Sequence, residues 1–353
     1  MATSRRDGAA QDRPAAGNRA VGLWLLGCCA LLLGMVVLGG VTRLTGSGLA
    51  IVHWQPVVGV VPPLSAEAWA QEFAHYRQSP EFLMVRSGMS LAAFRSIYLV
   101  EYAHRLAGRL LGLAFLLPAA YFLARRQIDR PLLRHLVAIF SLGGLQGALG
   151  WYMVQSGLVD VPRVSPYRLT AHLLVAMAIY AYMFWTGLGV LLGGARASPS
   201  APRGLARMSR ALLLLIAITI ASGGFVAGTK SGHAFPTFPL MQGELIPSGY
   251  WTARPWHANF FENIVTVQFN HRLLATVVLL ATAALCAHGL RHIAFGPLRR
   301  GLVAVAAAAC LQVGLGIATV LFHVPVGLAV AHQGSAVLLL SAALYVNNRL
   351  TYG

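Results

Sequence analysis

The chain has 353 residues, of which 57% are hydrophobic and only 10% are charged. A soluble domain carries about 25% charged residues, so this composition excludes an ordinary soluble globular protein and a disordered chain. All four cysteines lie in apolar runs, which also excludes a secreted disulfide scaffold and a Cys-x-x-Cys metal site. The formal charge of +17 does not indicate nucleic-acid binding, because the basic residues punctuate apolar runs and no nucleic-acid motif accompanies them.

Apolar runs of about 20 residues, each long enough to cross a hydrocarbon layer of ~30 Å as a helix, recur along the chain. They predict an all-α polytopic membrane protein with eight transmembrane helices. The predicted helices span residues 21–41, 94–123, 132–156, 167–192, 210–229, 262–288, 300–322 and 328–348. The second begins with a less apolar turn, which we expect to stand outside the hydrocarbon layer.

The distribution of Lys and Arg predicts how the chain lies in the membrane. The termini and the connections 124–131, 193–209 and 289–299 hold the larger share of the basic residues, whereas the connections 42–93, 157–166, 230–261 and 323–327 hold fewer. By the positive-inside rule, both termini are then cytoplasmic and the two long loops, 42–93 and 230–261, lie outside. Residues 1–20 form a cytoplasmic tail, and the first apolar run is a retained helix because no small-residue cleavage site follows it.

Short motifs recur in the same order in the two halves of the chain. The matched residues are Gly39-Gly40, Thr45, Ser47-Gly48 and Ala50 with Gly223-Gly224, Thr229, Ser231-Gly232 and Ala234; His104-Arg105-Leu106 with His271-Arg272-Leu273; Leu145-Gln146 and Gly150 with Leu311-Gln312 and Gly316; and His172 with His332. Four spans precede a cytoplasmic linker (193–209) and four follow it, so both copies have the same orientation. This predicts two tandem four-helix bundles (21–192 and 210–348, before a cytoplasmic C-terminus, 349–353) related by a pseudo-twofold axis along the membrane normal.

Four of the twelve histidines occupy matched positions near the outer starts of even-numbered spans. They are His104, His172, His271 and His332. A single histidine of this kind is often a hydrogen-bonded packing residue, but four at matched depth indicate a function. Two histidines on facing helices can ligate a heme iron, with the porphyrin held between apolar helices. Zinc would require further acids or thiolates nearby. The sequence therefore predicts two heme sites, one per bundle.

The two copies differ at one position three residues before a histidine. Glu101 precedes His104, whereas the equivalent residue before His271 is Gln268. A buried carboxylate is costly unless paired, so one interpretation is an ion pair with Arg105 or another nearby arginine. The other is a general base, or an electrostatic stabiliser of positive charge on a substrate. The second interpretation assigns chemistry to the first bundle and redox support to the second.

Arginines at the outer helix ends are candidate partners for heme propionates, because a guanidinium binds a carboxylate through forked hydrogen bonds. Snorkelling towards the interface is the alternative role. These residues are Arg43, Arg95, Arg105, Arg168 and Arg272.

These features together resemble a known family, heme A synthase, over about residues 20–350. Glu101-Tyr102-Ala103-His104-Arg105 is similar to the Glu-x-x-His-Arg signature of the family. The other landmarks follow in order, at Gly39–Gly48, Thr170-Ala171-His172, Asn270-His271-Arg272 and Ala331-His332-Gln333. Some members carry a cysteine pair in an outer loop. This chain has none, which places it nearer the subgroup shared by mitochondria and some bacteria.

The resemblance implies a heme b cofactor held by His271 and His332 and a substrate heme o site at His104 and His172. The implied reaction oxidises a methyl group of heme o to the formyl group of heme a, with Glu101 as the catalytic residue. It also implies heme o synthase as the donor, the assembly machinery of a terminal oxidase as the acceptor, and a bacterial inner membrane (alternatively the mitochondrial inner membrane) as the location. The electron acceptor, the source of oxygen and a homo-oligomeric state stay open.

Two other functions fit part of the pattern. A quinol-linked diheme b-type electron carrier explains the four histidines but not Glu101 opposite Gln268. A heme transporter or chaperone suits a parallel repeat, but transport needs a site that is reachable from both sides of the membrane, and all four histidines belong to the outer half.

Overall fold

The computed structural model describes residues 16–53, 58–159, 162–193 and 204–351, and within these ranges the regular elements are all helices. All eight predicted spans are present, as helices long and apolar enough to cross a membrane. They are α1 (Ala16–Leu44), α4 (Leu91–Ala124), α5 (Arg130–Gln155), α6 (Pro166–Leu192), α7 (Leu205–Thr229), α8 (Ile264–His292), α9 (Pro297–Leu321) and α10 (Val326–Thr351). The prediction of an all-α multi-pass membrane protein is confirmed.

The ends of the helices differ from the prediction by up to five residues, because local capping sets them. Helix α7 begins at Leu205 rather than at 210, directly after Gly204, whose φ of 92° is left-handed. The predicted linker is therefore shorter than 193–209, and its residues 194–203 lie outside the described ranges, as do 1–15 of the predicted tail and 352–353.

The loop between α1 and α4, named the first outer loop after its predicted side, contains two short helices that were not expected from the sequence. Helices α2 (Ala66–Tyr76) and α3 (Pro80–Val85) each begin after a serine, Ser65 or Ser79, whose hydroxyl accepts a hydrogen bond from a backbone N–H of the first turn. This is the usual N-cap geometry. Single turns of 3-10 helix lie in the outer loops at Val58–Val60, Ser231–His233 and Trp256–Phe260.

Helix α4 is longer than a single membrane crossing needs, and these short helices pack against its first turns. Its 34 residues make it about 50 Å long, compared with a hydrocarbon layer of ~30 Å. An outer aromatic cluster covers its first turns: Tyr76, Phe82, Phe94 and Tyr98 are buried there, and Trp69 and Phe73 pack against them. The expectation that the start of this span stands outside the hydrocarbon agrees with this packing.

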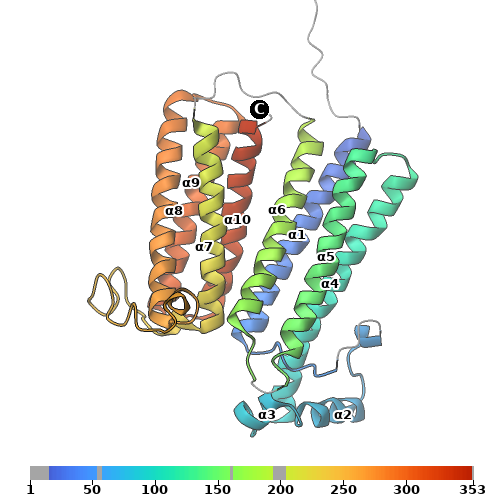
Figure 1. Ribbon diagram of the computed structural model, residues 1–353. Helices are drawn as coiled ribbons and strands as arrows, with labels where there is room; N and C mark the ends of the chain where they lie inside the picture. Colours follow the sequence, from blue (N-terminus) through green and yellow to red (C-terminus); the bar gives the residue numbers. More distant parts are fainter. Residues whose placement is uncertain (1–15, 54–57, 160–161, 194–203, 352–353) are drawn as a thin grey trace, which may run out of the picture.

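The eight long helices form two groups that lie side by side (Figure 1). Helices α1, α4, α5 and α6 make the first group and α7–α10 the second, and α6, α1, α7 and α10 contact one another between the groups. Helix α1 contacts α10 as α7 contacts α6, and α6 contacts α10. These contacts are reciprocal between the groups, and the pseudo-twofold axis itself stays a prediction.

The two groups share a continuous interior. The Tyr180 hydroxyl lies 2.7 Å from the Ser341 hydroxyl, and the Gln333 side chain donates to the carbonyl of Val36 at 2.8 Å. Helix α1 begins and α10 ends at one end of the molecule, and the long outer loops lie at the other (Figure 1). This placement matches an even number of spans in each group.

Candidate heme sites

In the first bundle, His104 on α4 and His172 on α6 each lie against a glycine of the preceding long helix. A Cβ added to Gly39 of α1 would lie 3.1 Å from Cε1 of His104, and one added to Gly150 of α5 would lie 3.0 Å from Cε1 of His172. The glycines thus let each ring lie directly against a neighbouring backbone, which restricts its orientation.

The second bundle repeats this arrangement with closely similar distances. A Cβ on Gly223 of α7 would lie 3.1 Å from Cε1 of His271, and one on Gly316 of α9 would lie 2.9 Å from Cε1 of His332. The two imidazole rings have centroids 6.4 Å apart and stand almost perpendicular, at 89°. The predicted pairing of His271 with His332 is therefore a close approach of the two rings.

The imidazoles of the two pairs are poorly satisfied by hydrogen bonds to the protein, which is unusual for purely structural histidines. Nδ1 of His104, His172 and His271 is buried without a hydrogen-bond partner in the described part of the chain. Buried polar groups without a partner are rare in proteins, and pairs of imidazoles between apolar helices are a ligand set that heme iron accepts. The donor chemistry thus suits one heme in each bundle.

The glycines that contact these rings are recognisable in the sequence only as repeated residues. They are Gly39, Gly150, Gly223 and Gly316. The glycines of α4 do not contact a ring in this way: a Cβ on Gly108 would meet Met35 at an ordinary 3.6 Å, and one on Gly112 would meet nothing within 4 Å. The recurrence of Gly39, Gly150 and their partners at matched offsets was the signal that marked the functional glycines.

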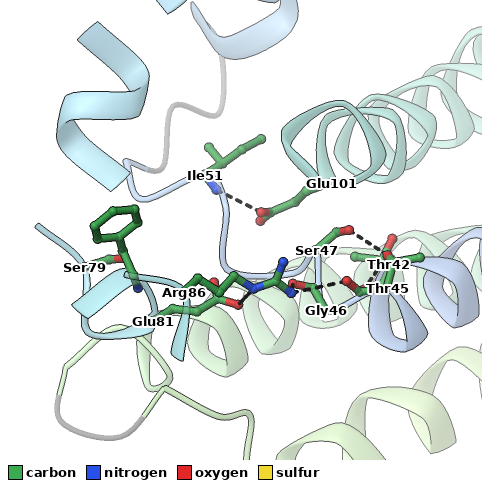
Figure 2. Close-up of polar contacts among 10 residues, drawn as sticks. Thr42, Thr45, Gly46, Ser47, Ile51, Ser79, Glu81, Arg86 and Glu101 are labelled. Carbon is green, nitrogen blue, oxygen red and sulfur yellow. Dashed lines mark hydrogen bonds and ion pairs between the residues drawn. The ribbon is translucent and has the colours of Figure 1, made fainter. Parts of the chain in front are cut away.

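Glu101 is 2% exposed and held on both sides, and Figure 2 shows the side on which it meets the backbone N–H of Ile51. One carboxylate oxygen accepts a hydrogen bond from the backbone N–H of Ile51 at 2.9 Å, and the other accepts from Nε (3.0 Å) and Nη2 (2.5 Å) of Arg105. Arg105 also donates to the carbonyl of Ile51 at 3.1 Å. The ion pair with Arg105, one of the two interpretations of Glu101, is present, and it fixes the carboxyl group three residues before His104 on the same helix.

At the equivalent place in the second bundle the carboxylate is missing. Gln268 donates to the carbonyl of Phe235 at 3.2 Å, and Arg272 donates to the carbonyls of Phe235 and Thr237, both at 2.7 Å. Over the described residues Arg272 makes no ion pair, and its Nε is buried without a partner. The first site therefore contains a neutral arginine–carboxylate pair, whereas the second retains an uncompensated positive charge.

The other candidate propionate partners have different surroundings. Arg43, in the last turn of α1, has a buried Nη1 without a partner in the described ranges. The guanidinium of Arg95 lies over the Trp69 ring at 5.2 Å, and that of Arg168 over the Tyr152 ring at 4.5 Å. None of these contacts tests the propionate prediction, which stays a prediction for all five arginines.

A second ion pair lies within the first outer loop, and its arginine also attaches the loop to the residues that follow α1 (Figure 2). Arg86 lies 3.3 Å from Glu81 and donates to the carbonyls of Thr45 (3.3 Å) and Gly46 (3.0 Å). Gly46 has a φ of 63°, and the guanidinium occupies the place a Cβ would take. Burial raises the pKa of the Glu81 carboxyl above its usual range, and the nearby Arg86 offsets this only in part.

Two asparagines organise the second outer loop where it enters α8. Asn263 caps this helix, accepting from the N–H groups of Val265 (3.0 Å) and Thr266 (3.4 Å), and donates to the carbonyl of Gly249 at 2.9 Å. Asn259 is fully buried and donates to the carbonyls of two loop residues. The loop is thereby held at the outer end of the helix that carries His271.

Comparison with known protein families then decides the relationship. Residues 22–344 match COX15-CtaA, described as cytochrome oxidase assembly protein. The chain belongs to this family. The matched segment contains all four histidines and Glu101.

Several relatives match this chain over nearly its whole length. The chain is 49% identical to the heme A synthase of Nitrosospira multiformis, over 96% of each chain. It is 45% identical to the heme A synthase of Nitrosomonas eutropha, over 97% of each chain. A plant relative, heme A synthase COX15 of Arabidopsis thaliana, is 46% identical over 94% of this chain and 74% of its own length. The resemblance seen in the sequence is confirmed, while the subgroup without the cysteine pair stays a prediction.

Proposed function

We propose that this protein is a heme A synthase, an oxidoreductase that converts a methyl group of heme o into the formyl group of heme a. One observation supports this most strongly: two repeat-matched histidine pairs, each packed on glycines, of which only the first has a carboxylate beside it. A symmetric electron carrier has no use for a carboxylate in one site alone. The names of the relatives support the same activity.

The histidine pairs divide between substrate and cofactor. His104 and His172 bind the iron of heme o in the first bundle, near Glu101, and His271 and His332 hold heme b in the second. When bound, heme b supplies one-electron redox chemistry. The arginines at the outer helix ends (Arg43, Arg95, Arg105, Arg168 and Arg272) are the candidates for the propionates of both hemes.

The reaction removes four electrons from the methyl carbon in two successive two-electron oxidations, through an alcohol and then a geminal diol that loses water. Each oxidation breaks one C–H bond of that carbon and forms one C–O bond to an oxygen atom from outside the protein, so that the proton leaves and two electrons pass to an external acceptor. Glu101 is buried and ionised, so it can accept this proton or stabilise positive charge that develops on the substrate. Arg105 and the N–H of Ile51 fix the carboxylate in place before the substrate arrives.

The membrane setting follows from the same proposal. The chain lies in the bacterial inner membrane with both termini cytoplasmic and the long loops outside, so both heme sites face the outer half of the bilayer. Heme o comes from a heme o synthase, and heme a passes to the assembly of a terminal oxidase.

The proposal is tested by Glu101→Gln, with Glu67→Gln, an exposed residue of α2, as the matched control. Glutamine keeps an acceptor for the Ile51 N–H but removes the charge. We expect the variant to retain both hemes and to form no heme a, while Glu67→Gln turns over normally. Wild-type turnover by Glu101→Gln would refute the role of the carboxylate.

A further inference from the structure

In the second bundle, hydrogen bonds to helix α9 leave one nitrogen of His332 free. Nδ1 of His332 lies 3.1 Å from the backbone carbonyl of Gln312, to which it donates. The Ser335 hydroxyl, one turn further along α10, donates to the side-chain carbonyl of Gln312. The Gln312 side chain is thus tied to Ser335, and Nε2 of His332 stays available for iron.

In the first bundle the matched glutamine binds the histidine itself. Nε2 of Gln146 donates to the backbone carbonyl of His172 at 3.0 Å and lies 3.2 Å from Nε2 of its imidazole. Because the Gln146 nitrogen is a donor, the imidazole Nε2 is the acceptor in this contact. The side chain of Gln146 therefore covers the nitrogen that corresponds to the free one in His332.

One residue accounts for the difference between the bundles. Val175 follows His172 by three residues, as Ser335 follows His332. Valine has no hydroxyl to hold the glutamine away from the ring. Accordingly, Oε1 of Gln146 is buried with no hydrogen-bond partner among the residues that the structure describes, whereas the matching atom of Gln312 is bonded to Ser335.

We propose that Gln146 is a reversible cap on His172, and that Ser335 prevents the same cap on His332. The inference rests on the proposed function, in which the first bundle binds a substrate and the second a resident cofactor. With the heme absent, the cap satisfies Nε2 of His172 and stabilises the empty site. Iron ligation has to displace it, which weakens heme binding and speeds release. A neutral hydrogen bond changes such an equilibrium by about twofold to tenfold.

This device suits the two roles. A substrate heme has to enter and a product heme has to leave in every cycle, whereas a cofactor heme has to stay. The cap affects the exchange of the substrate heme but not the retention of the cofactor heme. Gln146 and Gln312 belong to different bundles, and neither contacts the histidine pair of the other bundle. Gln146 and Ser335 are positioning residues in this scheme, since they act through the histidines.

The test is the transfer of heme from the full-length protein, loaded with heme b in both sites, to excess apomyoglobin, followed by absorbance. Wild-type protein should release heme in a fast phase from the first bundle and a slow phase from the second. Val175→Ser supplies the missing hydroxyl and Gln146→Leu removes the cap, so each should slow the fast phase about twofold to tenfold and leave the slow phase unchanged. Val175→Ala, which alters the same position without a hydroxyl, is the matched control and should release heme as the wild type does.

The reverse variant tests the second bundle. Ser335→Val frees Gln312 and should accelerate the slow phase only. Equal rate constants for the wild type, Val175→Ser and Gln146→Leu would overturn the cap, whatever the product assay shows. Slowed release in Val175→Ser and Gln146→Leu, together with a wild-type protein that makes no heme a, would instead support the cap and overturn the proposed reaction.

Discussion

The contact between Gly316 and His332 gives the most specific prediction for the second bundle. In Gly316→Ala the new Cβ would lie 2.9 Å from Cε1 and 3.3 Å from Nδ1 of the imidazole, so the ring has to retreat by about 0.5 Å to reach an ordinary contact of 3.4 Å. That shift also disturbs the 3.1 Å hydrogen bond from Nδ1 to Gln312. In the heme-free protein the ring can move, but iron ligation fixes it, so the steric cost falls on the heme-bound state. Overpacking costs about 1–3 kcal/mol, equivalent to about 5- to 150-fold in affinity.

The assay is a titration of purified, detergent-solubilised variants with heme b, with the heme bound per chain as the second readout. Gly314→Ala is a matched control, because a Cβ at Gly314 of the same helix would meet nothing within 4 Å. We expect weakened heme binding in Gly316→Ala and wild-type binding in Gly314→Ala. Equal heme affinities in the two variants would show that the ring is not held against α9 in the way described.

Three further predictions concern the outer loops and the second bundle. Because burial raises the pKa of Glu81, its protonated form stabilises the fold, and the free energy of unfolding falls as the pH rises above 4.5. Limited proteolysis of the first outer loop should therefore become faster as the pH rises in the wild type but not in Glu81→Gln. Asn263→Ala removes a helix cap and should destabilise the protein by about 1 kcal/mol in thermal unfolding, whereas Asn263→Asp should lose less; equal melting temperatures for the wild type and Asn263→Ala would contradict this. Gln268→Glu should pair with Arg272 and lower the midpoint potential of the heme in the second bundle, measured by spectroelectrochemistry, and an unchanged potential would count against the charge difference between the sites.

The long helices were predictable because the apolar runs that form them can be recognised in the sequence. An apolar run of about 20 residues identifies a membrane span without any knowledge of its neighbours. The ends were less accurate, since a cap such as Gly204 before α7 decides them. The matched offsets likewise indicated that His104, His172, His271 and His332 form a set before any contact was known.

Contacts between elements could not be predicted in the same way. Helices α2 and α3 are short, and they depend on packing against α4 through Tyr76 and Phe94. The role of Gly39 or Gly316 becomes visible only when the neighbouring helix brings an imidazole against it. The sequence alone also did not decide between the two interpretations of Glu101, whereas the structure shows the ion pair and leaves the carboxylate beside His104.

The difference between Gln146 and Gln312 illustrates the same limit. Both residues belong to the repeat, and their identity suggested equivalence. Their side chains differ because Ser335 and Val175, which the repeat does not match, offer different hydrogen-bonding partners. A conserved residue type in two copies therefore does not fix its role, since the neighbours decide what it binds.

The central claim is tested most directly by identifying the hemes in the protein purified from cells that also produce heme o. Extraction, chromatography and mass spectrometry should find heme b together with heme o, an alcohol intermediate or heme a. Two equivalents of heme b alone, with heme o available in the same cells, would contradict a substrate site in the first bundle and favour a diheme electron carrier.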